Sequence, residues 1–271
     1  MQISKINVNP NFKSGLNKNI IQNCSETSIS DVKMFLKQRN IESDFQSCQT
    51  IAFLTQKAVG LIETLKKKTG AKLFNFLIPS ISVYTLNKLV FDFHGTNFCI
   101  PETQNVFANE KSFLTGSIFF EKNDNLEKLN AKLDESYEKN ERSSSHYLSP
   151  IIHEFMHNVY LNYIYAKYGY EGECKYTKEK FSFKDKQNIG LTILHKLQLQ
   201  TFNEKENNII KNTIGKYATE KPNQYHEVFA ETFTKLICDS LSNNGNPEKN
   251  PLDLLKNLNP NFIEILSKVF I

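Results

Sequence analysis

The run SPIIHEFMHNVY, residues 149–160, contains His153, Glu154 and His157 in the spacing H-E-x-x-H. On a helix the two histidines are four residues apart and share one face, where their imidazoles can bind one zinc ion. Glu154 lies about 100° around the helix from His153, so it faces a water molecule beside the metal rather than the metal. Zinc lowers the pKa of that water toward 7, and the carboxylate takes its proton during attack on a carbonyl carbon. The motif therefore predicts a hydrolytic zinc site.

The residues around this motif predict a buried helix. Ser149 can cap the first turn, and Pro150 suits the first helical position. Apolar residues then occupy almost every side of the helix: Ile151, Ile152, Phe155, Met156, Val159, Tyr160, Leu161 and Ile164. Two imidazoles and a carboxylate are costly to bury on such a helix unless they are paired or bind a metal. The flanking residues therefore favour a metal site over a chance match.

A third metal ligand is expected from a later segment, NQYHEVFAETFTKLI, residues 223–237. Glu227 and Glu231 are four residues apart, and on a helix both lie at the edge of its apolar side. One carboxylate can bind the metal, while the other orients a ligating histidine through its second ring nitrogen. His226 is an alternative ligand, although it points about 100° away from Glu227 around the helix.

The two segments together resemble a known family. H-E-x-x-H followed by a helix of the pattern E-x-F-A-E-x-F is similar to the gluzincin metallopeptidases, in particular to the family of the anthrax lethal factor catalytic domain. The resemblance covers residues 149–160 and 213–237. The metzincin class is excluded, because Tyr160 and Tyr163 stand where that class requires a glycine and a third histidine.

The resemblance implies a zinc-dependent metalloendopeptidase and a role for each residue of the site. His153, His157 and Glu227 are then the zinc ligands, and Glu154 is the general base. Glu231 supports the site from beside the ligands. By the same resemblance, Tyr217 donates a hydrogen bond to the oxyanion that develops during hydrolysis. Three extra residues precede Glu227 compared with the family pattern Y-[AG]-x-x-N-x-x-E, so Tyr225 is a competing candidate.

The first half of the chain is expected to supply helices and a small sheet. Residues 1–30 are rich in Asn, Ser and Lys, and we expect a flexible extension there. A single domain then spans residues 31–271, with a long helix at 48–69 and an amphipathic helix at 125–142. Aromatic and β-branched runs between them predict three or four strands: SISVYTL, KLVFDFHG, NFCIP and GSIFFEKN. We expect GSIFFEKN at the sheet edge beside the metal-binding helix, where an extended substrate can pair with it.

The second half of the chain is expected to be almost entirely helical and to carry the zinc site. Residues 31–148 hold the first helices and the sheet. Across residues 149–271 the apolar pattern predicts helices at 150–168, 187–200, 204–215, 224–242 and 251–270. This order of elements predicts an α+β class. With the resemblance it implies a zincin-like fold, in which a small mixed sheet and an active-site helix precede a mostly helical C-terminal half.

Composition narrows the function classes. The 33 basic and 29 acidic residues are spread along the chain, which gives no case for nucleic-acid binding. The five cysteines form no C-x-x-C pair, which favours a reducing compartment over a disulfide framework. We find neither an apolar run long enough to span a membrane nor the apolar core of a secretory signal. We therefore expect a soluble protein, either cytoplasmic or secreted by a route that uses no signal peptide.

The leading hypothesis is a zinc metallopeptidase that acts on a peptide or protein substrate. The alternative keeps Zn²⁺ but drops catalysis, which gives a zinc-binding interaction module or a degenerate peptidase. A lethal-factor-like catalytic half fits a toxin or effector delivered into another cell, and equally a cytoplasmic housekeeping peptidase. Among the histidines outside the motif, His146 lies in a run of serines, where we expect it to be exposed to solvent.

Overall fold

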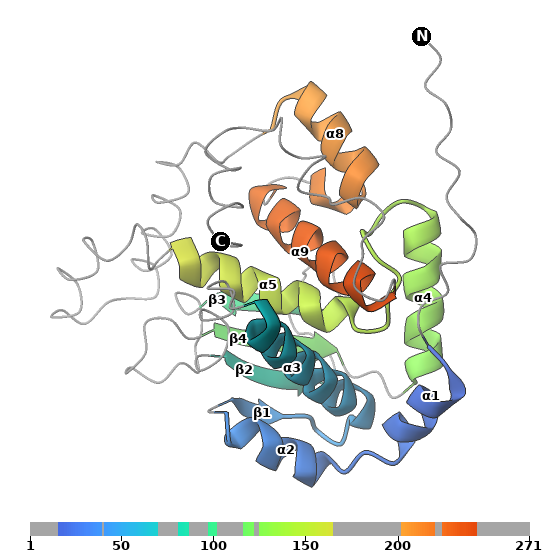
Figure 1. Ribbon diagram of the computed structural model, residues 1–271, viewed down its shortest axis with the longest axis vertical. Coiled ribbons are helices and arrows are strands. Elements are labelled where there is room, and N and C mark those ends of the chain that lie inside the picture. Colours follow the sequence, from blue (N-terminus) through green and yellow to red (C-terminus); the bar gives the residue numbers. More distant parts are fainter. Residues whose placement is uncertain are drawn as a thin grey trace, which may run out of the picture.

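The structure, a computed structural model, describes residues 16–39, 41–69, 81–86, 97–101, 116–121, 125–164, 202–219 and 224–242. Within these ranges, helices pack around a four-stranded sheet (Figure 1). This combination agrees with the α+β class expected from the sequence. The predicted strand KLVFDFHG and the predicted helices at 187–200 and 251–270 lie outside the described residues.

The sheet is mixed, with the strand order β1-β2-β4-β3. Its strands are β1 (Glu42–Asp44), β2 (Ile81–Leu86), β3 (Asn97–Pro101) and β4 (Gly116–Glu121). β1, β2 and β4 are parallel neighbours. β3 runs antiparallel to β4, with Asn97 opposite Phe120 and Pro101 opposite Gly116. Three of the four runs predicted as strands therefore form β2, β3 and β4.

The sequence does not predict two features of this sheet. Residues 116–121 of the predicted strand GSIFFEKN form β4, which lies between β2 and β3, so the expected place of this strand at the sheet edge is wrong. The edge strand that packs on the helix of the H-E-x-x-H motif is β3. An apolar pattern identifies a strand but not its neighbours, because neighbours come from distant parts of the chain. β1 is also unexpected, since its residues lack the apolar pattern of a strand and pair with β2 through the backbone.

Two helices, α1 (Lys18–Ser25) and α2 (Ile29–Lys37), lie where a flexible extension was expected at residues 1–30, so that prediction is wrong from residue 18 onward. The side chains of Asn17 and Ser28 cap the two helices by accepting hydrogen bonds from backbone N–H groups of the first turns. α1 also packs against the long helix α3. The polar composition therefore reflects capped surface helices from residue 18 onward, while the first 15 residues lie outside the described part.

The other helices of the described residues match the positions predicted from the apolar pattern to within a few residues. They are α3 (Gln49–Thr69), α4 (Leu126–Glu138), α5 (Ser149–Ile164), α8 (Glu204–Ile214) and α9 (Gln224–Ser242), with a short 3-10 helix η4 (Tyr217–Thr219). In Figure 1, α5 runs between the sheet and α9 and packs against both. The fold thus places the H-E-x-x-H helix at its centre.

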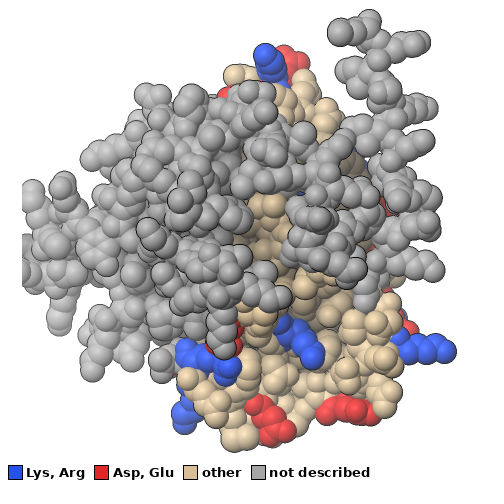
Figure 2. All heavy atoms as spheres, viewed as in Figure 1, with Lys and Arg blue, Asp and Glu red and all other residues tan. Residues whose placement is uncertain are grey.

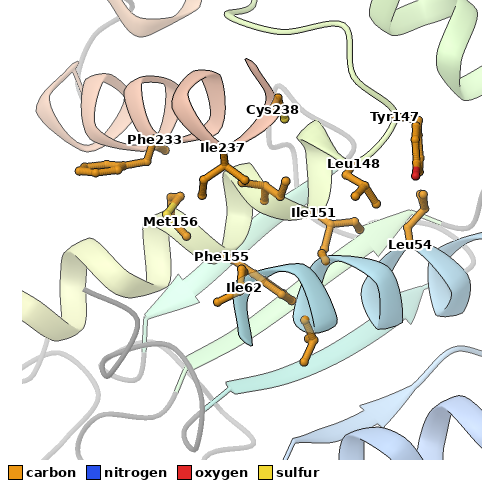
Figure 3. Close-up of a cluster of buried hydrophobic side chains, with 14 of the residues drawn as sticks. Leu54, Ile62, Tyr147, Leu148, Ile151, Phe155, Met156, Phe233, Ile237 and Cys238 are labelled. Carbon is orange, nitrogen blue, oxygen red and sulfur yellow. The ribbon is translucent and has the colours of Figure 1, made fainter. Parts of the chain in front are cut away.

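A core of apolar side chains from α3, α5 and α9 holds α5 in this position (Figure 3). Phe155 and Met156 on α5 are fully buried, as are Ile62 on α3 and Phe233 on α9. Burying a side chain of this size contributes about 1.5–3 kcal/mol relative to leaving it exposed. Because these contacts fix the rotation of α5 about its axis, they also fix the direction in which its polar residues point.

The visible surface of the described residues carries both signs of charge. On the face in Figure 2, lysine and arginine side chains are interspersed with acidic ones and form no single basic patch among the described residues. Among the described helices, none is both long enough and apolar enough to cross a lipid bilayer. Neither observation contradicts the expectation that the protein does not bind nucleic acid and does not span a membrane.

Candidate metal centre

Helix α5 carries the H-E-x-x-H motif into the interior of the protein. His153, Glu154 and His157 are each only 5% exposed. The fully buried neighbours Ile152 and Phe155 face the core, so the polar residues of the motif turn toward α9. The imidazole rings of the two histidines meet edge to face, with 4.4 Å between their centroids. The helix expected from the sequence therefore forms and buries its polar face as predicted.

Helix α9 brings two carboxylates to the same place. Glu227 lies in its first turn and Glu231 one turn later, with side-chain exposures of 13% and 2%. Phe229 and Phe233 are fully buried on the same helix and pack on one another, which anchors α9 against α5. The Glu pair is thus a buried feature of the α5–α9 interface rather than a solvated helix face.

Three ligand atoms converge between α5 and α9. The Nε2 atoms of His153 and His157 are 2.9 Å apart, and Oε2 of Glu227 lies 3.2 Å from the first and 3.4 Å from the second. Ligand atoms about 2.0–2.1 Å from one tetrahedral metal ion are roughly 3.3–3.4 Å from each other. The three residues could therefore hold a metal ion, and they are the predicted set.

Glu231 orients one of these histidines from behind. Its Oε1 lies 3.2 Å from Nδ1 of His153 and accepts a hydrogen bond of 3.0 Å from Nη1 of Arg142. Its Oε2 accepts a hydrogen bond of 2.9 Å from the backbone N–H of Ser143. Burial raises the pKa of this carboxyl, but His153, Arg142 and Ser143 outweigh burial and lower the pKa to about 2. Glu231 is therefore an anion with fixed neighbours, as the predicted supporting role requires.

The protonation of His153 follows from the same carboxylates. Burial lowers its pKa, while Glu231 and Glu227 together raise the pKa to about 10. The imidazole is thus doubly protonated and positively charged at neutral pH when no metal is bound. A metal ion that binds Nε2 must displace a proton, so metal binding and proton release are coupled at this residue.

Glu154, the predicted general base, is buried beside the two histidines of its helix. Burial raises the pKa of its carboxyl, and the two neighbouring histidines oppose this rise. Its Oε2 is buried and makes no hydrogen bond with any described residue. A buried carboxylate oxygen without a partner is costly, so this atom is suited to a water molecule or substrate group in the site. Glu154 therefore adds a buried carboxyl group with an unsatisfied oxygen to the helix that carries the two histidines.

Tyr217 is brought to the site by an unusual backbone segment. Gly215 ends α8 with a φ of 101°, and a Cβ there would lie 2.7 Å from the carbonyl oxygen of Glu141. Only glycine allows this close approach at this φ. The backbone N–H of Tyr217 then donates to that same carbonyl at 3.0 Å. As a result, the Tyr217 hydroxyl donates to Oε1 of Glu227 at 3.4 Å, and burial raises its pKa.

Arg142 is a site residue that the sequence does not reveal. Its guanidinium group pairs with Glu231 and lies 3.6 Å from the centroid of the Tyr217 ring. In the sequence it ends the polar, surface-type run NLEKLNAKLDESYEKNER and has no spacing relation to the H-E-x-x-H motif. The sequence contains one indirect signal for such a residue: if Glu231 is buried, its carboxylate needs a cation or several hydrogen-bond donors.

His146 corrects another expectation. It is only 8% exposed rather than solvent-exposed, and burial lowers its pKa to about 4. Its ring stacks on Tyr147, and its Nδ1 accepts the backbone N–H of Leu148 at 3.2 Å. The serine run thus forms a buried turn before α5. The side chains of the alternative candidates Tyr225 and His226 lie outside the described part of the chain.

Comparisons with protein families, with curated proteins and with solved structures find no match. The chemistry of this site is therefore inferred from its residues and their geometry. Two imidazoles and one carboxylate that converge beside a buried glutamate are the observations available for that inference.

Proposed function

We propose that this chain is a zinc-dependent metalloendopeptidase. The observation that carries the proposal is the convergence of His153, His157 and Glu227 beside the buried Glu154. Two imidazole nitrogens and one carboxylate oxygen form a donor set that suits zinc and leaves one position open for a water molecule or substrate. Calcium and magnesium prefer oxygen ligands, which makes them poor candidates for this set.

Each residue then has a defined task in peptide hydrolysis. A zinc ion held by the three ligands would supply a Lewis acid and would lower the pKa of water toward 7. Glu154 takes the proton from the attacking water and delivers it to the leaving amine. The raised pKa of its carboxyl brings it closer to the neutral pH at which a general base works best. Glu231 holds His153 in the orientation that presents Nε2.

Tyr217 supplies the third catalytic function in this proposal. Its hydroxyl reaches the ligand Glu227 in the structure, so it lies beside the position where the substrate carbonyl would bind. The pKa of a tyrosine hydroxyl is ordinarily near 10 and burial raises it further, so the hydroxyl is protonated at neutral pH and can donate a hydrogen bond to the developing oxyanion. The same donor is less costly to bury because the Glu227 carboxylate accepts from it before substrate binds.

The resemblance to gluzincins supports the peptidase assignment and a zincin-like fold. The first glutamate of the E-x-F-A-E-x-F helix lies beside Nε2 of His153, and the second lies beside Nδ1, as expected for a ligand and a supporting residue. The antiparallel edge strand β3 packs on α5 next to the site, which suits an extended peptide substrate. These features favour peptide hydrolysis over the alternative of a zinc-binding module without catalysis.

The variant Glu154→Gln tests the proposal. Purified wild-type protein and the variant should each contain about one zinc ion per chain by elemental analysis, because Glu154 is not a ligand. Cleavage of a quenched fluorescent peptide library should fall about 10²–10⁴-fold in the variant, since the general base is lost. The matched control is Glu135→Gln, which changes an exposed glutamate of α4 and should cleave like the wild type.

Two results would contradict the proposal. Full peptide cleavage by Glu154→Gln would remove the general-base mechanism. Stoichiometric zinc in a wild-type protein that cleaves no member of the library would instead favour the zinc-binding module.

A further inference from the structure

Arg142 contacts two parts of the candidate site at once. Its Nη1 donates to Oε1 of Glu231 on α9 at 3.0 Å, and its guanidinium carbon lies 3.6 Å from the centroid of the Tyr217 ring. The Glu231 side chain is 2% exposed, whereas that of Arg142 is 33% exposed. Arg142 therefore closes the outer side of the site, with its charged edge on one partner and its flat face on the other.

The first contact acts on a metal ligand through a carboxylate. Glu231 is held by Arg142 on one oxygen and by the Ser143 N–H on the other, so its plane is fixed. That fixed carboxylate lies 3.2 Å from Nδ1 of His153. Without Arg142, Glu231 would keep the Ser143 N–H as a donor and could rotate away from the imidazole. The orientation of His153 toward a metal therefore depends on Arg142 through Glu231.

The second contact acts on the candidate oxyanion donor. The backbone beside Arg142 binds the segment of Tyr217, because Lys216 N–H donates to Asn140 O at 2.8 Å and Tyr217 N–H donates to Glu141 O at 3.0 Å. These bonds place the Tyr217 backbone, and the guanidinium group then covers one face of its ring. The ring can turn less freely about its side-chain bonds, which keeps the hydroxyl beside Glu227.

We propose that Arg142 is a positioning residue for this site, which aligns His153 through Glu231 and the hydroxyl of Tyr217 through its ring. The inference rests on the proposed function, in which His153 binds zinc and Tyr217 assists hydrolysis. A planar guanidinium group is suited to both tasks, because it can pair with a carboxylate along its edge and stack on an aromatic ring with its face. A lysine ammonium group can replace only the charge.

Zinc affinity tests the first task without any need for a substrate. Zinc itself is the probe, and its dissociation constant is measured on the full chain by competition with a chromophoric chelator. Arg142→Met should weaken zinc binding about 10–100-fold, as expected when a partner of a ligating histidine is lost. The matched control is Arg39→Met, since Arg39 also pairs with a glutamate and covers an aromatic ring, but away from the site. This control should bind zinc like the wild type.

The conservative variant Arg142→Lys separates the two tasks. It keeps a cation for Glu231 and should recover most of the zinc affinity lost in Arg142→Met. It lacks the flat face, so at saturating zinc its kcat for a peptide taken from the cleavage library should stay about tenfold or more below wild type. KM should change less than kcat, because the misplaced hydroxyl acts on the transition state. A thermal melt of each variant shows that it is folded.

A double variant tests whether Arg142 acts through Glu231. If it does, Arg142→Met combined with Glu231→Gln should bind zinc no more weakly than Glu231→Gln alone, since the two changes break one connected network. Wild-type zinc affinity and kcat in Arg142→Met would overturn the proposal, and so would an equal loss of affinity in Arg39→Met. A wild-type protein that binds no zinc would instead refute the proposed function. If it binds zinc but cleaves no peptide, the peptidase assignment fails and the zinc affinities alone decide the role of Arg142.

Discussion

Two arginines of this chain make the same kinds of contact in different surroundings. Each pairs with a glutamate of another element, and in each the guanidinium carbon lies 3.6 Å from the centroid of an aromatic ring. One group, here called the peripheral cluster, joins the end of α2 to α3, and the other, the site cluster, lies at the candidate metal centre. Their members are Arg39, Glu63 and Phe35 in the peripheral cluster, and Arg142, Glu231 and Tyr217 in the site cluster.

The two glutamates differ in burial and in what surrounds them. The Glu63 side chain is 28% exposed, and both its oxygens accept from Arg39, at 2.8 and 3.0 Å. Glu231 is 2% exposed, receives only one bond from Arg142, and also contacts Ser143 and His153. Exposed pairs contribute about 0–1 kcal/mol, whereas a buried carboxylate is costly unless several partners surround it. The peripheral cluster therefore links two helices, while the site cluster holds a charge in a fixed direction.

The largest expected difference between the clusters is the cost of removing the carboxylate charge. Glu231→Gln should lower the free energy of unfolding by about 3 kcal/mol, because it leaves Arg142 without its buried anion. The equivalent change Glu63→Gln should cost only about 0.5 kcal/mol in its more exposed position. Urea denaturation of both variants at neutral pH measures the two values. Equal losses would show that the site cluster is an ordinary ion pair.

A second comparison uses the two aromatic rings. Tyr217→Phe gives the site cluster the same ring as the peripheral cluster and removes only the hydroxyl. Zinc affinity should stay close to wild type, while kcat for peptide cleavage should fall about 100-fold, the cost of losing one oxyanion donor. Steady-state kinetics at saturating zinc measure this effect. If kcat is unchanged, Tyr217 is not the donor and Tyr225 becomes the candidate.

The smallest expected effect concerns acid sensitivity in the segment that carries the site cluster. His146, four residues after Arg142, has its pKa lowered by burial from 6.5 to about 4. Because the folded protein binds this proton less readily than the unfolded chain, the stability contributed by neutral His146 is fully present above pH 6.5. It is lost as the pH falls from 6.5 to 4.

The variant His146→Asn isolates this effect. Asparagine keeps an acceptor for the Leu148 N–H but does not titrate, so its free energy of unfolding should vary less between pH 6.5 and 4. Urea denaturation across this pH range compares the two proteins. Parallel pH profiles would show that His146 does not contribute to the acid sensitivity of the fold.

Much of the candidate site is predictable because its main motifs lie within single helices. The positions of α5 and α9 follow from their apolar periodicity, and the spacing of His153, Glu154 and His157 places them together on one helix. Glu227 and Glu231 follow from the same reasoning on α9. The order of strands does not follow, and neither does the burial of the polar turn that holds His146.

Tyr217 and Arg142 show where short-range reasoning ends. The spacing between Tyr217 and Glu227 departs from the family pattern, yet the positive φ of Gly215 and two backbone hydrogen bonds still bring the hydroxyl to Glu227. Arg142 is 89 residues from Glu231 in the sequence, and its own segment reads as an ordinary charged surface. Such pairings depend on how separate elements pack.

The sequence by itself determined the helices from α3 onward within the described residues, the strands β2 to β4, and the residue types that can bind a metal, because periodicity and motif spacing are properties of short segments. Only the tertiary structure decided that Glu227 and Glu231 face the two histidines, that β3 rather than β4 is the edge strand beside α5, and that Arg142 closes the site. These outcomes come from the packing of α5 against the sheet and α9. That packing is fixed by many apolar contacts together and is not encoded by any one segment.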